Sequence, residues 1–360
     1  MTTEETDGKR GWRRHVKVIV GVAAVAGVGV FAYTMWRRRQ PHLIAAPVAR
    51  VSSKHPVLII NPGSGGGKAN KIGLASAATA LGIETIVRKK GEKIPELANS
   101  AVDRGADHLL IAGGDGSQAR VANVAIKRGV AFSCVPSGTR NHFAMDLGLD
   151  RSDPKKALSA AFDGVEFKVD VGRIAKRLFV NNVSFGVYAE ALADPDYRAH
   201  KAKSIADAAA AKAEHPEDGL SVTAPDGTVH DDIGMLLASN NPYQYIGAPD
   251  FAGRAALDTG LVGVIMADRS AVNPSGISGS EIKEWTTQKL TVESAQKKVP
   301  VGIDGSLHKV KAPVDVRIDR AALRVVLPTD VAKQEIEFST GLTPEAFAHL
   351  AVGDTASDSE

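Results

Sequence analysis

The sequence is poor in cysteine and in aromatic residues. Its 360 residues include a single cysteine, Cys134, and aromatic side chains make up 5% of the chain. One cysteine excludes an internal disulfide and is compatible with a reducing compartment. Cys134 lies in the apolar run VAFSCVP, which predicts a buried strand residue and argues against a reactive nucleophile.

The sequence also lacks a strong charge of either sign. The formal net charge is +3, but residues 1–54 hold ten Lys or Arg against three acids, whereas the rest of the chain holds 34 against 38. A basic stripe interleaved with aromatic residues is missing, so we expect no nucleic-acid partner. The ten histidines form no group with the spacing of a zinc site.

The longest uncharged run lies near the N-terminus. Residues 18–36, VIVGVAAVAGVGVFAYTMW, carry no charge, and as a helix they would span roughly the thickness of a bilayer's hydrocarbon core. Lys and Arg bracket the run, and Trp12 and Trp36 lie near its ends, where interfacial aromatic residues occur. We expect one transmembrane helix, preceded by a basic N-terminus (1–17) and followed by a tether (37–54).

Two other interpretations of this segment stay open. A cleaved signal peptide needs small residues after its apolar run, and the three arginines at 37–39 argue against cleavage. Arg13 and Arg14 ahead of an apolar stretch resemble a twin-arginine export signal, which would place the body outside the cytoplasm. Positive charges flank both ends, so the positive-inside rule does not fix the orientation.

From residue 55, apolar runs alternate with amphipathic stretches. We expect strands at PVLIIN, ETIVR, DHLLIAGG and VAFSCVP, with helices between them over 68–81, through IPELANSAVDRG and through QARVANVAIKRG. Continuously apolar strands separated by helices predict a parallel sheet covered on both faces. Residues 55–165 are therefore expected to form a doubly wound α/β domain, whose ligands bind at the carboxyl ends of the strands.

Short alternating runs follow from residue 166. They are RLFVNNVSFG, LSVTAP, IGMLLASN, LVGVIM, KLTVES, VPVGIDG, PVDVRI and ALRVVLP. Such runs predict antiparallel strands, and we expect a β-rich sandwich domain over 166–330. The alanine-rich AHKAKSIADAAAAKAEH predicts a surface helix or lid, and residues 331–360 are expected to form a C-terminal segment with a polar tail.

Two glycine clusters follow expected strands. NPGSGGGKAN fails the P-loop spacing, because Pro62 replaces the first required glycine and Ala69 replaces the Ser or Thr. Glycines between a strand and a helix still present bare amides and a positive helix end to an anion, although a flexible turn is the alternative. In LLIAGGDGSQARVANVA, Asp115 adds a carboxylate where a phosphate-bound magnesium ion or an acceptor hydroxyl would lie.

These clusters resemble blocks of the diacylglycerol kinase catalytic-domain family. GGDGS is similar to the GGDGT signature that this family shares with sphingosine kinases, NAD kinases and, more distantly, phosphofructokinases. NPGSGGGKAN and VPSGTRNHFAMDLGL are similar to the NPxSG and PxGTxNDFA blocks of the lipid-kinase branch. Later matches are VDVGR, FVNNVSFGVYAE, LDTGLVGV and VGIDGSLH, and the chain is identified as a member of the family over residues 54–330.

The resemblance implies an ATP- and Mg²⁺-dependent transfer of the γ-phosphoryl group to a lipid hydroxyl, with diacylglycerol or a related lipid as acceptor. It implies nucleotide-binding roles for Asn61, Gly63, Ser64 and Gly65, for Gly114, Asp115, Gly116, Ser117 and Gln118, and for Gly138, Thr139 and Asn141. The implied catalytic residues are Asp115 and Asp304, and the implied metal ligands are Asp115 and Asp258. Phosphoryl transfer depends mainly on positioning and charge neutralisation, which glycine loops and a metal supply.

The sequence departs from the family pattern in the nucleotide and metal blocks. Ser117 keeps the hydroxyl of the usual Thr, whereas His142 replaces an Asp. The family's metal-linked Asp falls on Thr259, with Asp258 one residue earlier.

A further departure concerns the proton acceptor. Ser306 stands where the family has the Glu proposed as general base, and a serine does not accept a proton at neutral pH as a carboxylate does. We expect either Asp115 or Asp304 to take this role, helped by His308, or else a weak or inactive kinase.

A membrane anchor fits a lipid acceptor, because tethering raises the effective concentration of the enzyme at the bilayer. The expected location is the cell membrane, with one span and a cytoplasmic catalytic body, since ATP is there. A homodimer stays open. The alternative functions are a soluble-metabolite kinase of the NAD-kinase type and a nucleotide- or lipid-binding relative without catalysis.

Overall fold

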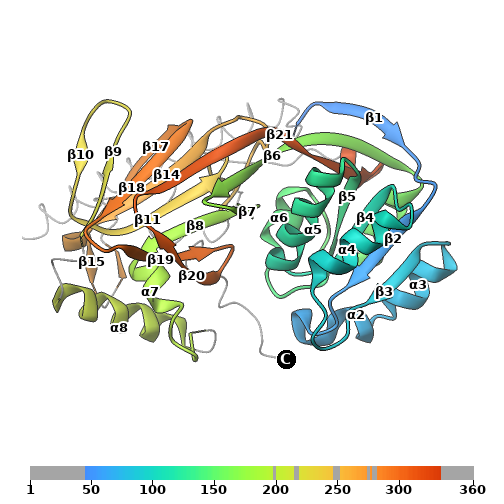
Figure 1. Cartoon of the computed structure of the whole chain (residues 1–360), viewed down its shortest axis with the longest axis horizontal. Helices are drawn as coiled ribbons and strands as arrows, with labels where there is room; N and C mark the ends of the chain where they lie inside the picture. Colours follow the sequence, from blue (N-terminus) through green and yellow to red (C-terminus); the bar gives the residue numbers. More distant parts are fainter. Residues whose placement is uncertain are drawn as a thin grey trace, which may run out of the picture.

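The computed structural model describes residues 45–197, 200–214, 219–245, 252–273, 276–277 and 282–333. These residues form two domains that lie side by side along the long axis of the molecule (Figure 1). An α/β domain forms one half and a β-rich domain the other. Within this part of the chain, no helix is long and apolar enough to cross a membrane. The predicted transmembrane helix at 18–36 and the basic residues before it lie outside the described residues.

The α/β domain is built on a parallel sheet. Its central strands are β2 (Pro56–Ile60), β3 (Glu84–Val87), β4 (His108–Gly113) and β5 (Ala131–Pro136). They lie in the order β3-β2-β4-β5, and each neighbouring pair is parallel. β2, β4 and β5 are buried along their whole length, as expected for a parallel sheet with both faces covered. The predicted parallel sheet is confirmed.

The helices of this domain lie between the strands in the sequence. They are α2 (Lys68–Lys71), α3 (Leu74–Ala80), α4 (Ile94–Asp103), α5 (Asp115–Arg128), α6 (His142–Asp146) and the short 3-10 helix η2 (Pro154–Ala161). The sequence predicted one helix over 68–81. The structure instead has α2 and α3, because Gly73 takes a left-handed φ of 64° and interrupts the helix.

The strand order determines where a ligand can bind. From β2 the chain moves outward to β3, and from β4 it moves the other way to β5. Right-handed crossovers in opposite directions place α3 on one face of the sheet and α4 and α5 on the other. The loops after the neighbouring strands β2 and β4 therefore diverge, and open α/β sheets bind ligands at such a switch point.

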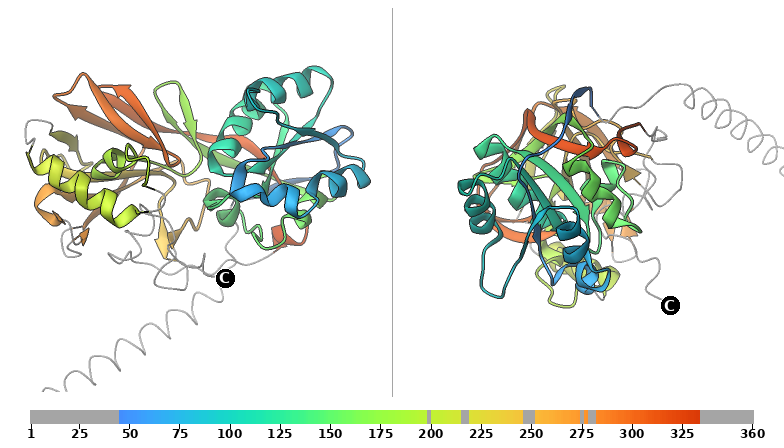
Figure 2. Two further views of the ribbon diagram at one scale, coloured as in Figure 1. Left: turned by 90° about the horizontal axis from the view of Figure 1, so that it is seen from below. Right: turned by 90° about the vertical axis from the view of Figure 1, so that its right-hand side faces the viewer.

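Two long strands run through both domains. They are β6 (Gly164–Ile174) and β21 (Val314–Pro328), paired antiparallel with an irregularity between Asp319 and Leu323. At one end Val325 of β21 pairs in parallel with Phe132 of β5, which extends the α/β sheet. At its other end β21 pairs with a strand of the β-rich domain, and Figure 2 shows β21, in red, passing between the two halves. The runs PVDVRI and ALRVVLP, predicted as separate strands, are thus one strand.

The β-rich domain contains a separate antiparallel sheet in the order β17-β14-β11-β8-β19-β20. Its strands are β8 (Asn182–Gly186), β11 (Ile233–Asn240), β14 (Val262–Asp268), β17 (Ile282–Thr287), β19 (Lys298–Ile303) and β20 (Ser306–Lys311). A second layer is formed by one end of β21 together with β9 (Leu220–Thr223), β10 (Val229–His230) and β18 (Lys289–Ser294). Leu236 and Val264 of the first layer share one buried core with Val292 and Val316 of the second, as in the predicted sandwich.

Two helices and several short elements complete the described chain. The alanine-rich segment forms α8 (Lys201–Glu214), which packs against α7 (Val187–Ala191). The short strands are β1 (Pro47–Val51), β7 (Arg177–Phe179), β12 (Gln244–Tyr245), β13 (Ala252–Gly253), β15 (Val272–Asn273) and β16 (Gly276–Ile277). The remaining 3-10 turns are η1 (Ser64–Gly67), η4 (Arg269–Ala271) and η6 (Val331–Lys333).

A buried histidine links three strands of the extended sheet. His108 Nε2 lies 2.8 Å from Ser133 Oγ, and Ser133 Oγ donates to the carbonyl of Val326 at 2.5 Å. Ser133 must therefore accept from an Nε2–H, which leaves Nδ1 of His108 to accept from Ser53 Oγ at 2.8 Å. Burial lowers the pKa of His108 to about 4. His108 is a neutral structural residue that holds β4, β5 and β21 together.

Candidate active site

Three loops at the carboxyl end of the parallel sheet are in direct contact. The backbone amide of Gly114 donates to Ser64 Oγ at 2.8 Å. A Cβ on Gly65 would lie 2.4 Å from the carbonyl oxygen of Ser137, and a Cβ on Gly138 would lie 2.3 Å from Cα of Gly114. Any other residue at 65 or 138 would force these backbones apart. The structure thus brings together the three sequence blocks for which nucleotide-binding roles were predicted.

Polar side chains of these blocks tie the loops to one another. Asn61 Nδ2 donates to Ser117 Oγ at 3.0 Å, and Gln118 Nε2 lies 3.4 Å from Asn141 Oδ1. Asn141 also accepts from the Gly138 amide at 3.1 Å and donates to the Gly138 carbonyl at 2.6 Å. Apart from Gln118 Oε1, which is buried without a partner among the described residues, these polar groups bond within the protein, so a ligand would meet mainly the backbone of the loops.

The loops fit a polyphosphate. A Cβ on Gly63, Gly66 or Gly116 would meet no atom within 4 Å, so the space beside these backbones is open. Gly116 lies in the first turn of α5, a helix of 14 residues, and the first amides of a helix have no partner within it. Free amides and the positive end of the helix dipole favour an anion at this position. Thr139, also predicted here, accepts at its carbonyl from Arg151 at 3.1 Å.

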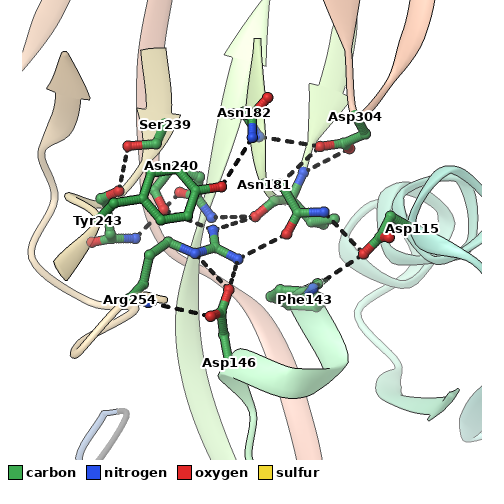
Figure 3. A network of polar contacts seen from close by, with 12 residues as sticks. Asp115, Phe143, Asp146, Asn181, Asn182, Ser239, Asn240, Tyr243, Arg254 and Asp304 are labelled. Carbon is green, nitrogen blue, oxygen red and sulfur yellow. Dashed lines mark hydrogen bonds and ion pairs between the residues drawn. The ribbon is translucent and has the colours of Figure 1, made fainter. Parts of the chain in front are cut away.

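Asp115 is the first residue of α5 and is buried. Its Oδ1 accepts from the backbone amide of Phe143 at 3.1 Å and from Asn181 Nδ2 at 2.9 Å (Figure 3). Within the described residues, both hydrogen bonds to this carboxylate end on Oδ1. Oδ2 is therefore the oxygen that can bind a cation or an acceptor hydroxyl.

Asp304 occupies the tight turn between β19 and β20, with a φ of 44°. Its Oδ2 accepts from the Val180 amide at 3.0 Å, and its Oδ1 accepts from the amides of Asn181 and Asn182 at 2.9 and 3.3 Å. Desolvation raises the pKa of Asp304 to about 7, although these backbone amides favour the charged form. A carboxylate with such a pKa can take up a proton near neutral pH.

Asn181 connects the two predicted catalytic acids. Its side chain donates to Asp115 of the α/β domain, and its backbone amide donates to Asp304 of the β-rich domain (Figure 3). Both acids line one pocket between the domains. Arg140 and His142 line it from the α/β side, and Tyr188 and Tyr197 line it from the β-rich side.

His142 takes the place of the Asp in the third sequence block. Its Nε2 is buried and has no hydrogen-bond partner among the described residues. Burial lowers the pKa of His142 below its usual value, which favours the neutral imidazole at physiological pH.

The two predicted metal ligands differ in their surroundings. Asp258 is exposed and is not among the residues that line the pocket. It lies close enough to Asp170 to help raise the pKa of that carboxyl, although desolvation is the larger cause. Asp170 in turn accepts from the backbone amide of Gly260 at 2.6 Å. In the described part of the chain, no group of three or more His, Cys, Asp or Glu residues could hold a metal ion.

Magnesium still fits the site through Asp115, since this ion often takes only one or two carboxylates and completes its shell with phosphate and water. Ser306, at the position of the family's Glu, is exposed at the start of β20. Neither Ser306 nor His308 lines the pocket. The pKa of His308 is lowered by desolvation and by the charges of Arg177 and Arg120.

Residues 55–174 match the family model described as the diacylglycerol kinase catalytic domain. The match covers about a third of the chain, and over these residues the chain is similar to that domain. A diacylglycerol kinase of Mycobacterium tuberculosis is 30% identical over 120 residues, which are 32% of this chain and 39% of the relative. A diacylglycerol kinase of Bacillus subtilis is 34% identical over 86 residues, 23% of this chain and 28% of the relative. The chain thus matches less than half the length of these curated relatives.

A solved structure extends the likeness of fold to both domains. The crystal structure of a diacylglycerol kinase from Bacillus anthracis str. Sterne superposes with a TM-score of 0.55 and covers 78% of this chain and 99% of that protein. The sequence identity is 15%. The likeness therefore concerns the fold, a mixed α/β domain with a parallel sheet and a separate antiparallel sheet.

The sequence did not predict the buried polar residues between the domains. Asn181, Asn240 and Arg254 are each 3% exposed or less. One signal was available: the sequence contains two Asn-Asn pairs, FVNN and ASNN, each directly after an apolar run. Burying an asparagine side chain without hydrogen-bond partners costs free energy. Two adjacent asparagines at the end of a buried strand therefore predict a network of hydrogen bonds.

Proposed function

We propose that the protein is a lipid kinase that transfers the γ-phosphoryl group of ATP to a lipid hydroxyl, with diacylglycerol or a related lipid as acceptor. The observation that carries this proposal is the pairing of Asp115 and Asp304. The two acids come from different domains, line one pocket and are bridged by Asn181, beside three glycine-containing loops. The family and the names of the matched relatives support a lipid acceptor.

The loops would hold the triphosphate through their backbone. The open space at Gly63, Gly66 and Gly116 leaves room for phosphate oxygens, and the amino end of α5 favours their charge. Magnesium, when bound, would neutralise charge on the transferred group, with Oδ2 of Asp115 as its protein ligand.

We assign to Asp304 the role of accepting the proton of the acceptor hydroxyl. Its pKa of about 7 keeps a useful fraction deprotonated at neutral pH while leaving it a competent base. The bond that forms joins the acceptor oxygen to the γ-phosphorus, and the bond that breaks releases ADP. The hydroxyl proton moves to the Asp304 carboxylate, from which solvent removes it.

The predicted transmembrane helix at 18–36 would hold this site at the cytoplasmic face of the cell membrane. A tethered domain meets a bilayer-bound acceptor at high effective concentration, without a soluble encounter. This part of the proposal is tested by fractionation of the full chain and of a variant that lacks residues 1–44.

The experiment for the reaction itself measures transfer of labelled phosphate from ATP by the full chain in lipid vesicles. The acceptors to compare are diacylglycerol, monoacylglycerol, a sphingoid base, a polyprenyl alcohol and NAD, the last for the soluble-metabolite alternative.

Asp115→Asn should abolish transfer, because it removes the charge but keeps the shape. Asp258→Asn is the matched control and should stay near wild type, since Asp258 is exposed and outside the pocket. If wild type and Asp115→Asn transfer equally little phosphate, the kinase proposal fails.

A second candidate is a non-catalytic nucleotide- or lipid-binding relative. The presence of Ser306 in place of the family's Glu favours it. This candidate predicts ATP binding by calorimetry without transfer to any acceptor of the panel.

A further inference from the structure

Arg254 is a fully buried cation at the junction of the two domains. Its side chain donates through Nε to Asp146 Oδ2 at 2.8 Å, and Nη2 donates to the same oxygen. Nη1 donates to the carbonyls of Val180 and Asn240 at 2.5 and 2.8 Å. Asp146 belongs to α6 of the α/β domain, whereas Arg254 follows β13 of the β-rich domain. The ion pair therefore joins the two domains.

The remaining contact of this guanidinium points toward the active site. Nη2 of Arg254 donates to Asn181 Oδ1 at 2.9 Å, and Asn181 Nδ2 donates to Asp115 Oδ1 at 2.9 Å (Figure 3). The charges at the two ends fix which way the amide of Asn181 faces. A flipped amide would turn its NH₂ group toward the guanidinium and its oxygen toward the carboxylate, and both contacts would be repulsive.

We propose that Arg254 and Asn181 are positioning residues for phosphoryl transfer. Arg254, anchored on Asp146, fixes the Asn181 amide, and this amide holds Oδ1 of Asp115 so that Oδ2 is presented to the pocket. The inference rests on the proposed kinase function. It adds a physical consequence: the contact of the two domains and the orientation of Asp115 are set by one continuous series of hydrogen bonds.

The series has the geometry that positioning requires. All of its members are buried, with Arg254 at 0% and Asn181 at 3% exposure. Asn181 reaches Asp115 through its side chain and Asp304 through its backbone amide, so the two acids share no donor. The rings of Phe143 and Tyr243 lie 5.9 and 5.8 Å from the guanidinium, which limits the conformations that Arg254 can adopt. Loss of the Asn181 link would leave Oδ1 of Asp115 with only the hydrogen bond from the Phe143 amide among the described residues, so the carboxylate would be held less firmly.

The decisive variant is Asn181→Asp. It keeps the shape of the side chain and the contact with Arg254, but it replaces the donor that faces Asp115 by a carboxylate oxygen. We expect kcat to fall about 10²-fold, as for a small misplacement of a reacting group, while KM for ATP stays close to the wild-type value.

If kcat of Asn181→Asp equals that of the wild type, the proposal is overturned.

Arg254→Lys tests the other end of the series against a matched control. Lysine keeps the charge beside Asp146 but lacks the fork that also reaches Asn181, so kcat should fall about tenfold or more. The control is Arg324→Lys, because Arg324 also makes a two-point pair with a buried carboxylate, Glu166, at 3.1 and 2.8 Å. That pair joins β21 to β6 and has no contact with the acids, so kcat should be retained. Equal losses in the two variants would overturn the proposal.

Hydrogen exchange does not depend on catalysis, so it tests the positioning role of Arg254 and Asn181 independently of the proposed kinase activity. In protein labelled at asparagine side chains, the Asn181 amide hydrogens should exchange slowly with solvent in the wild type, because both ends of the group are hydrogen-bonded and buried. They should exchange at least tenfold faster in Arg254→Lys and remain slow in Arg324→Lys. If wild type transfers no phosphate, the kinase proposal fails, and the exchange rates still decide the positioning series. Equal exchange in wild type and Arg254→Lys would reject it.

Discussion

The backbones of Gly114 and Gly138 touch, with Cα of Gly114 only 2.3 Å from the place that a Cβ on Gly138 would occupy. Gly138→Ala must therefore push the second and third loops apart. We expect the free energy of unfolding to fall by about 1–3 kcal/mol, as for an overpacked core, and the affinity for ATP to fall with it. Urea unfolding and calorimetry measure the two effects.

Gly116 provides the matched control for this substitution. A Cβ there meets no atom within 4 Å, and the residue lies in the first turn of α5. Gly116→Ala should leave stability unchanged or raise it by about 0.5–1 kcal/mol, since alanine favours the helix. It should still weaken ATP binding if phosphate occupies this space. Similar losses of stability in both variants would contradict the contact between the loops.

Asp304 should give the pH–rate profile an acid limb near neutrality. Its pKa is about 7, and only the deprotonated carboxylate accepts a proton, so kcat/KM should rise with pH through that value. Asp304→Asn should lower the rate by about 10²–10⁴-fold and remove this limb. A limb that persists unchanged in the variant would assign the base to another residue.

His108 should make the fold sensitive to mild acid. Burial lowers the pKa of His108 in the folded state to about 4 from a usual value of 6.5. Between these two pH values the unfolded chain therefore binds a proton at His108 and the folded chain does not. Stability is then fully present above the unfolded pKa and is lost as pH falls from 6.5 toward 4, by on the order of 3 kcal/mol. His108→Gln should be less stable than wild type at neutral pH but should show a flatter pH dependence. Urea unfolding across this pH range checks both, and parallel curves would contradict a neutral buried histidine.

The pair of Arg254 and Asp146 should show strong coupling in stability. Arg254→Met leaves the Asp146 carboxylate buried without its cation, and such a loss typically costs about 3–5 kcal/mol. Asp146→Leu should cost a similar amount. The double variant should be more stable than the sum of the single effects predicts, because it buries no unpaired charge. Additive losses in a double-mutant cycle would show that the pair is not coupled.

The sequence predicted those features that are set by nearby residues. Largely apolar runs predicted the parallel strands β2, β4 and β5, because a strand buried on both faces is mostly apolar along its length. The glycine clusters located the loops, since the close approach of Gly114 and Gly138 tolerates no side chain. The positions of Asp115 and Asp304 in one pocket came from the family motifs, and the structure shows them bridged by Asn181.

The features that the sequence did not predict depend on residues far apart in the chain. Arg254 and Asp146 are 108 positions apart in the sequence, and Asn181 and Asp115 are 66 positions apart. No local sequence pattern therefore predicts these contacts. A local motif likewise suggested Asp258 as a metal ligand, but its exposure and its place beside Asp170 follow from the packing of a turn. The single strand β21 was missed because its irregularity resembles a break between two strands.

The shared strand β21 has a consequence for how this protein can be divided. The region that matches the family model ends at residue 174, yet the strand beside β5 comes from residues beyond 313. A fragment cut at the end of the match would leave the edge of β5 unpaired and a hydrophobic face uncovered, a combination that promotes aggregation. We therefore do not expect residues 55–174 to fold by themselves, and truncated proteins must retain β21 to be informative.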